Sequence, residues 1–160
     1  MPYDWRVWSK LMKIIVLSDS HGRVGLIQDV IEKEEFDKLI FLGDGLRDFA
    51  YIEDERIIKL AGNCDFFTYC EAKEMRLELS GVKLLATHGH LYDVKRGLGG
   101  LVLEAKKKEI NLVLFGHTHM SYCETIDGIT FLNPGSIANG RYAIIELSNA
   151  GVVKIENKML

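Results

Sequence analysis

Histidine and carboxylate residues follow several apolar segments of this chain, and they have the clearest potential for chemistry. His117 and His119 are separated by one threonine, and Asp19 and His21 by one serine. The full set of potential ligands contains only oxygen and nitrogen donors and comprises Asp19, His21, Asp44, Asn63, His88, His117 and His119. Because each of them comes directly after a run typical of a buried strand, the set predicts a hydrolytic site with two metal ions.

The spacing of the aspartates suggests how they act. If the chain stays extended after the first strand, Asp19 and His21 project to the same side and reach one cation together. Asp44 follows Gly43, where the chain can turn sharply at the carboxyl edge of a sheet, which is where sites of open α/β sheets assemble. A carboxylate can bridge two ions about 3.5 to 4 Å apart. Asp44 is therefore the candidate bridging ligand.

Each of these residues has an ordinary structural explanation when it is taken alone. An aspartate after a strand is most often a helix N-cap, a Gly-Asn pair is most often a turn, and a single histidine is usually a hydrogen-bonded core or surface group. Taken together, five separate segments place a ligand after an apolar strand, and no fold needs four histidines and two aspartates there for stability. The pattern as a whole favours metal binding.

The elements that must position these residues alternate between strand and helix in the first half of the chain. Residues 13–17 form a strongly apolar run, and residues 24–35 carry apolar side chains at helical spacing. Residues 38–42 and 56–60 are short apolar runs bounded by turn residues, as is typical of buried strands. The first half is therefore predicted to be α/β.

Hairpins are more frequent in the second half. Residues 75–79 alternate between apolar and polar and lead through a Ser-Gly turn into residues 82–86, while Asp127 and Gly128 form a strong type I′ hairpin signal. The other predicted elements are a helix over 98–110 and strands over 112–115, 122–126, 129–132, 141–147 and 152–156. We expect an α/β fold of two packed mixed β-sheets flanked by helices, with a single domain over residues 13–160 and an N-terminal extension over residues 1–12.

The composition limits the class of protein. A chain of 160 residues, 48% of them hydrophobic, suffices for one domain with its own core. A net charge of −3 gives no general attraction for nucleic acid or anionic lipid, so no stable nucleic-acid partner is expected. Cys64, Cys70 and Cys123 lack zinc-ribbon spacing and predict no disulfide framework, and no apolar run is long enough to span a bilayer. We expect a cytoplasmic protein without membrane contact.

The ordered motifs resemble the calcineurin-like metallophosphoesterase superfamily, and most closely its small single-domain phosphodiesterases of YfcE type. The resemblance extends from residue 13 to about residue 156. Its motifs are Ser18-Asp19-Ser20-His21, Gly43-Asp44, Gly62-Asn63-Cys64-Asp65, Thr87-His88-Gly89-His90, Gly116-His117-Thr118-His119 and Asn133-Pro134-Gly135-Ser136. The resemblance implies a four-layer sandwich, with helices outside two central sheets.

The resemblance also implies a role for each site residue. The ligands of one metal would be Asp19, His21 and His119. The ligands of the other would be Asn63, His88 and His117, with Asp44 bridging the two ions. His90 would lie behind the ligands or face the substrate, and it joins Asp44 and Asn63 as a candidate catalytic residue.

The donor atoms restrict the metals and suggest the reaction. Oxygen and imidazole ligands suit Mn²⁺, Fe, Co²⁺, Ni²⁺ or Zn²⁺ better than Cu(I), and Mn²⁺ is favoured for activity in vitro. Two such ions would lower the pKa of a shared water, attract phosphoryl oxygens and offset charge during in-line attack. The expected function is therefore that of a metal-dependent phosphodiesterase or broader phosphoesterase, which hydrolyses a small phosphate ester or a nucleotide-type substrate with metal-activated hydroxide.

Two other functions remain open. A retromer subunit of eukaryotes has the fold of this superfamily but serves as a protein-binding scaffold, so the chain is alternatively a metal-binding interaction scaffold without significant catalysis. The third reading is a protein that uses its metals only to hold a nucleotide. The complete set of seven competent ligands favours the enzyme, because a scaffold can lose its ligands freely.

Several positions depart from the family pattern or have two explanations. Many relatives have a histidine where this chain has Cys64, and a small buried cysteine is the favoured interpretation. Either His90 or Asp65 would then assist the leaving group, or catalysis would favour esters whose leaving group needs little protonation, such as aryl phosphates and activated diesters. Phe66, Phe67 and Tyr69 form either an aromatic wall for a base or aryl group, or a core or homodimer contact. Lys95 and Arg96 have a possible role in contacting phosphate. The run of lysines over residues 106–108 is interpreted as a solvated helix end, with a substrate-steering patch as the alternative.

Overall fold

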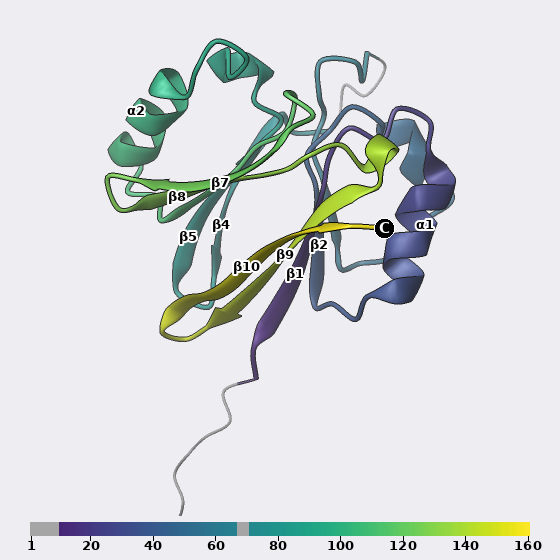
Figure 1. The fold of residues 1–160 in the computed structure, drawn as a ribbon, viewed down its shortest axis with the longest axis horizontal. Coiled ribbons are helices and arrows are strands. Elements are labelled where there is room, and N and C mark those ends of the chain that lie inside the picture. The colour runs from purple at the N-terminus through teal and green to yellow at the C-terminus, as the bar shows by residue number, and fades with distance from the viewer. Residues whose placement is uncertain (1–9, 67–70) are drawn as a thin grey trace, which may run out of the picture.

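Two five-stranded mixed sheets stack on each other in the computed structural model of the chain, which describes residues 10–66 and 71–160 (Figure 1). The strand order of the first sheet is β10 (Gly151–Met159), β9 (Arg141–Ser148), β1 (Met12–Leu17), β2 (Lys38–Phe41) and β3 (Ile57–Lys59). The order of the second is β4 (Glu74–Leu79), β5 (Val82–Thr87), β6 (Leu112–Leu114), β8 (Ile129–Pro134) and β7 (Ser121–Ile126). The predicted pair of packed mixed sheets is confirmed.

The helices lie on the outer faces of the sheets and complete four layers. Helix α1 (Val24–Lys33) covers the first sheet, where its Ile27 and Val30 join a core cluster with Ile15 of β1. Helix α2 (Gly99–Lys107) covers the second sheet, where Leu101 packs in a cluster with Val113 of β6. The short 3₁₀ helices are η1 (Leu46–Phe49), η2 (His90–Tyr92) and η3 (Ile137–Asn139).

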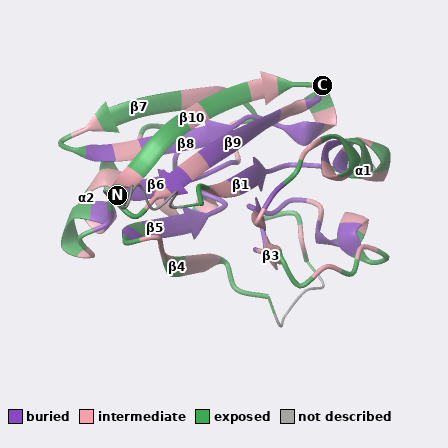
Figure 2. Ribbon diagram, turned by 90° about the horizontal axis from the view of Figure 1, so that it is seen from below, coloured by how far each residue is buried: buried purple, intermediate pink, exposed green. Residues whose placement is uncertain are grey.

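The main core fills the space between the two sheets. Alternate residues of each strand point inward, because side chains of a strand alternate between its faces. Ile14 and Val16 of β1 thus lie in one cluster with Leu84 of β5 and Leu114 of β6, all fully buried. Figure 2 shows the same gradient across the molecule, with buried central strands and the more exposed edge strands β7 and β10. In the described residues, no helix has the length and apolar character needed to cross a membrane.

The predicted elements are confirmed with small changes at their ends. The hairpin of β7 and β8 has the type I′ backbone that its turn predicts, with positive φ at both Asp127 (50°) and Gly128 (80°). Helix α1 ends at Lys33, two residues before its predicted end, because Glu34 takes an extended backbone and its carboxylate accepts hydrogen bonds from other elements.

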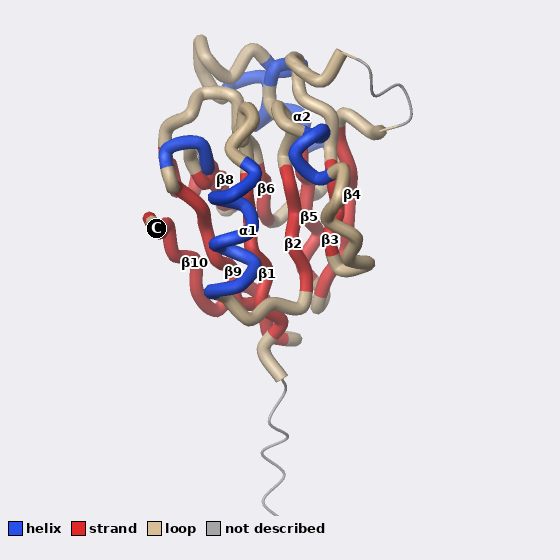
Figure 3. The backbone as a smooth tube through the Cα atoms, turned by 90° about the vertical axis from the view of Figure 1, so that its right-hand side faces the viewer, coloured by secondary structure: helices blue, strands red, loops and turns tan. Residues whose placement is uncertain are grey.

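The parallel strands of both sheets end on the same side of the molecule. Strands β1, β2 and β3 are parallel in one sheet, and β5, β6 and β8 are parallel in the other. Their carboxyl ends lead into loops that gather at the end opposite the start of β1 (Figure 3). This loop cluster is where the predicted ligands are found.

Candidate metal centre

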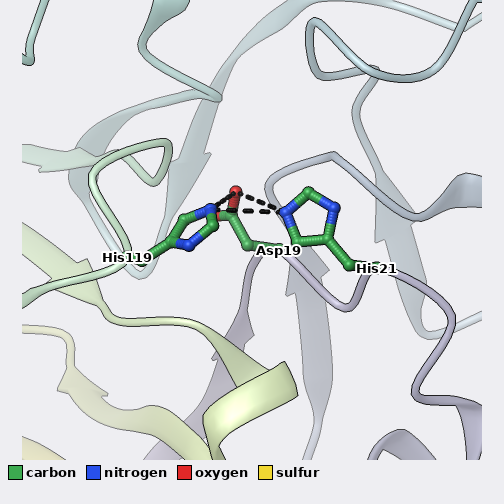
Figure 4. Close-up of side chains that lie close together, drawn as sticks. All are labelled: Asp19, His21 and His119. Atoms are coloured by element: carbon green, nitrogen blue, oxygen red, sulfur yellow. Dashed lines mark hydrogen bonds and ion pairs between the residues drawn. The ribbon is translucent and has the colours of Figure 1, made fainter.

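Three of the predicted ligands meet above β1 and β6. The Oδ1 atom of Asp19 lies 3.0 Å from Nε2 of His119 and 3.6 Å from Nε2 of His21. The two histidine Nε2 atoms are themselves 3.3 Å apart (Figure 4). One carboxylate oxygen and two imidazole nitrogens thus converge on one point, as a first metal would require.

A second group lies next to the first. The Oδ2 atom of Asp44 is 3.2 Å from Nε2 of His88, whose Nε2 is 3.2 Å from Nδ1 of His117. Both His88 and Asp44 are almost completely buried. The Nδ1–H of His88 donates to the carbonyl of Leu42 at 3.0 Å, so its Nε2 faces the centre with a free lone pair when the ring is neutral.

Asp44 stands between the two groups. Its Oδ2 lies 4.0 Å from His21 of the first group, in addition to its contact with His88 of the second. Asp19 also reaches across, because its Oδ1 is 3.9 Å from Nε2 of His88. The six described side chains of the two groups therefore form one continuous cluster.

Asp19 shows an unmet requirement that a cation would satisfy. Its Oδ1 is buried and accepts no hydrogen bond from the described residues, whereas its Oδ2 accepts from the Ser18 hydroxyl and the His117 N–H. A buried carboxylate oxygen without a partner is costly. A divalent ion between Asp19, His21 and His119 would remove that cost, so the residues present fit a bound metal.

Asn63 and His90 lie at the margins of the cluster. Asn63 is exposed in the loop after β3, and its Nδ2 donates to Sγ of Cys64 at 3.4 Å. The His90 ring is centred 5.5 Å from that of His88 and 6.3 Å from that of His117, and its buried Nδ1 has no hydrogen-bond partner among the described residues. Both predicted residues are thus adjacent to the site, and their roles stay predictions.

The backbone of the site is unusual. Five predicted ligands have positive φ angles, between 42° and 69°: Asp19, His21, Asp44, His117 and His119. The left-handed conformation costs an ordinary residue about 1 to 2 kcal/mol, so such clustering is typical of functional sites. The assumption that Asp19 and His21 lie on extended backbone is therefore wrong, because both residues have left-handed backbone conformations.

The charge states of two of the predicted ligands, Asp44 and His117, suit a cation. Burial raises the pKa of Asp44, but hydrogen bonds from the His88 ring and the Cys64 N–H outweigh burial and hold that pKa well below its usual range. Burial lowers the pKa of His117, and the nearby positive charges of His88 and Lys95 lower it further. Asp44 is thus ionised and His117 neutral near pH 7, the forms that bind metals.

Asp65 fixes the loop that carries Asp44. Its Oδ2 accepts the N–H groups of Asp44 (2.7 Å) and Gly62 (2.8 Å), and its Oδ1 accepts those of Gly45 and Leu46, both at 2.9 Å. One carboxylate therefore joins the loops after β2 and β3. From the sequence Asp65 was considered only as an aid to the leaving group, because hydrogen bonds to backbone groups twenty residues away leave no local pattern.

Asn133 has a comparable role that the sequence did not assign. Its Nδ2 donates to the Gly116 carbonyl and the Thr118 hydroxyl, both at 3.0 Å, and so holds the loop between the two histidines after β6. The motif Asn133-Pro134-Gly135 is the only sequence signal for this position.

The interpretation of Cys64 as a buried core residue is wrong. The residue is exposed, its N–H donates to Oδ1 of Asp44 at 2.7 Å, and its thiol faces His21 and Asp44. Although the residue as a whole is exposed, partial desolvation of its sulfur and the hydrogen bond to Asp44 raise the pKa of the thiol. Cys64 is therefore a weak acid at the rim of the site.

The other ambiguous positions are partly resolved. Phe66 is 72% exposed, so core packing is wrong for this residue, whereas Phe67 and Tyr69 lie outside the described residues. Arg96 pairs with Asp93, and Lys106 with Asp127. Lys106 and Lys108 at the end of α2 thus form ion pairs, the latter with Glu104, in line with a solvated helix end.

Comparison with known proteins identifies the class. The chain matches the family model described as a calcineurin-like phosphoesterase superfamily domain over residues 12–158. The chain belongs to this superfamily. It is 32% identical over 146 residues to the probable metallophosphoesterase YsnB of Bacillus subtilis, covering 86% of each protein. It is 30% identical over 145 residues to the phosphodiesterase MJ0936 of Methanocaldococcus jannaschii, covering 78% of this chain and 83% of that protein.

Solved structures agree with the fold. A predicted phosphoesterase from Streptococcus pneumoniae superposes with a TM-score of 0.74 at 27% identity, over 94% of this chain and 98% of that one. Vacuolar protein sorting 29 from Cryptosporidium parvum superposes with a TM-score of 0.72 at 11% identity, over 94% and 99% of the two chains. The second likeness shows the fold alone.

Proposed function

We propose that the protein is a metal-dependent phosphodiesterase that holds two divalent ions, with Mn²⁺ favoured. The observation that carries the proposal is the buried Oδ1 of Asp19, which has no hydrogen-bond partner among the described residues and lies within 3.6 Å of the Nε2 atoms of His21 and His119, beside the second group of Asp44, His88 and His117. The superfamily membership and the phosphodiesterase relative support the same class of reaction.

The ligands have distinct tasks in this proposal. When bound, two divalent ions supply a nucleophilic water at neutral pH and offset the charge of the phosphoryl group. Asp19, His21 and His119 hold one ion, and Asn63, His88 and His117 hold the other. Asp44 contributes a carboxylate to both, since its Oδ2 lies between His21 and His88. The hydrogen bond from His88 to Leu42 fixes the ring orientation that ligation needs.

His90 is the proposed proton donor to the leaving group. It lies beside His88 and His117, and its buried Nδ1 has no hydrogen-bond partner among the described residues. Cys64 is too weak an acid for this role, because its pKa is raised. Esters with good leaving groups, such as aryl esters, are therefore expected to depend little on His90.

The proposal is tested by comparing a diester with a monoester. Metal-stripped protein is resupplied with Mn²⁺ and assayed with bis-p-nitrophenyl phosphate and p-nitrophenyl phosphate, with Asp44→Asn as the blank. We expect Mn²⁺-dependent turnover that favours the diester and falls at least about 100-fold in Asp44→Asn, since the variant loses a ligand of both ions. Turnover that does not depend on Mn²⁺, or that Asp44→Asn retains, would refute the assignment of the metal-dependent site.

A scaffold function is the second candidate, because a fold shared with vacuolar protein sorting 29 does not by itself establish catalysis. It predicts a protein that binds metal but hydrolyses neither ester. The same assay separates the two functions when metal content is measured in parallel.

A further inference from the structure

A cavity of about 300 Å³ opens beside the candidate metal centre. Its lining includes the predicted ligands His21 and Asp44, and also Arg47, Cys64 and Phe66. Because the cavity shares residues with the candidate metal centre, it has room for a substituent of a phosphoryl group held there. The wall formed by Arg47, Cys64 and Phe66, which are not predicted ligands, decides which substituents fit.

Phe66 gives that wall its character. The ring belongs to a large apolar side chain that is 72% exposed, although burying a side chain of this kind would stabilise the fold. An aromatic face on the wall of a cavity offers a stacking surface for another ring. Arg47 lines the same cavity, and a guanidinium group also stacks on aromatic rings.

The floor of the cavity is held in place by two carboxylates. Asp48 accepts the hydroxyl of Ser20 and the N–H of Gly22, at 2.5 and 2.8 Å, and Asp65 accepts the N–H of Gly45. The packing at Gly45 is close, since a Cβ there would lie 1.8 Å from Oγ of Ser20. These contacts fix the shape of the cavity before a substrate arrives, which favours affinity.

We propose that this cavity is a specificity site for a planar aromatic substituent of the phosphoester, either an aryl ring or a nucleobase, stacked on Phe66. The inference rests on the proposed function and extends it to a substrate class. The volume supports a single ring system, because it lies at the lower end of the range of about 300 to 1,000 Å³ for small-molecule sites.

Inhibition by matched pairs of phosphorus compounds tests the proposal. In each pair, one member carries an aromatic ring and the other does not: phenylphosphonate against methylphosphonate, and adenosine 5′-monophosphate against ribose 5-phosphate. Inhibition constants are measured against Mn²⁺-dependent hydrolysis of bis-p-nitrophenyl phosphate. We expect the ringed member of at least one pair to bind about tenfold more tightly, and that preference to disappear in Phe66→Ala and persist in Phe66→Tyr.

The choice of pair identifies the source of the ring. A preference in the phenyl pair alone indicates an aryl ester, and one in the nucleotide pair indicates a nucleobase. Tyr51→Ala is the matched control, because Tyr51 is 99% exposed and does not line the cavity; it should leave both preferences unchanged. Turnover without a ring preference in either pair, or a preference that survives in Phe66→Ala, overturns the inference. Absence of turnover instead counts against the proposed function.

Thiol labelling gives a readout that does not depend on turnover. Cys64 lines the cavity, whereas Cys123 is exposed on β7. Phenylphosphonate in the presence of Mn²⁺ should slow the labelling of Cys64 by N-ethylmaleimide more than methylphosphonate does, and leave Cys123 unaffected, as followed by mass spectrometry of peptides. Equal effects of the two phosphonates on Cys64 would contradict occupation of the cavity by the ring.

Discussion

Asp65 illustrates how one side chain shapes the candidate metal centre without being a predicted ligand. Its two oxygens accept four backbone N–H groups, from residues 44–46 and from Gly62. Asp44 has a positive φ of 62°, a conformation that the surrounding contacts must maintain. At the scale of the residue, the position of the Asp44 carboxylate therefore depends on a second carboxylate behind it.

Replacing Asp65 with asparagine should weaken metal binding. The new amide NH₂ cannot accept two of the four N–H groups, so the loop carrying Asp44 shifts. We expect the affinity for Mn²⁺ to fall by about 10- to 100-fold, as is typical when the support of a metal ligand is lost. Calorimetric titration with Mn²⁺ measures this change.

The matched control is Asp127→Asn, in the exposed turn between β7 and β8, which should leave Mn²⁺ affinity unchanged. The positioning role also predicts that kcat falls at saturating Mn²⁺ while KM for the diester changes by less than about threefold. An unchanged Mn²⁺ affinity in Asp65→Asn would show that the hydrogen bonds of Asp65 do not position Asp44.

Glu34 connects three strands of the first sheet with the helix that covers its outer face. Its carboxylate follows α1 and accepts hydrogen bonds from Lys13 of β1 (3.1 Å), Tyr142 of β9 (2.7 Å) and Lys158 of β10 (2.6 Å). Burial raises the pKa of Glu34, but these three partners outweigh burial and lower the pKa from 4.5 to about 2. At the scale of the element, this residue joins the helix to three strands of its sheet.

The lowered pKa of Glu34 predicts that the folded protein loses stability in acid. A carboxylate whose pKa is lowered on folding contributes stability that is complete above about pH 4.5 and is lost as the pH falls toward 2. We expect about 2 to 3 kcal/mol of the unfolding free energy to disappear over that range. Denaturant unfolding at several pH values measures it.

Glu34→Gln should be less stable at pH 7 and should lose part of this pH dependence. Glu78→Gln, on the exposed side of β4, is the control and should behave like the parent protein. Identical acid profiles for Glu34→Gln and the parent would contradict the role of Glu34.

The sequence predicted the elements better than their ends. Alternation in β4 and the Asp127-Gly128 turn are local signals, and the structure confirms the hairpins that they indicate. The end of α1 at Lys33 was missed because contacts of Glu34 with Tyr142 and Lys158, more than one hundred residues away, decide it. Signals confined to neighbouring residues do not contain such contacts.

At the scale of the whole molecule, the topology assembles the centre. Parallel strands in two different sheets end on one side, so segments as distant as Asp19 and His119 meet at 3.0 Å. The cluster of Asp19, His21, Asp44, His88, His117 and His119 could be predicted, because the residue types and their places after strands are visible in the sequence. Three features could not be predicted from the sequence, because they arise from packing between loops. They are the exposure of Cys64, the support from Asp65 and the cavity beside Phe66.

The most direct test of a centre for two metals is the number of ions that bind. Metal-stripped protein is dialysed against Mn²⁺, and metal and protein are quantified. Two tightly bound ions per chain are predicted, with one remaining in His119→Ala, since His119 lies against Asp19 and His21 of the first ligand group. One ion or none in the parent protein, or two in His119→Ala, would contradict the account.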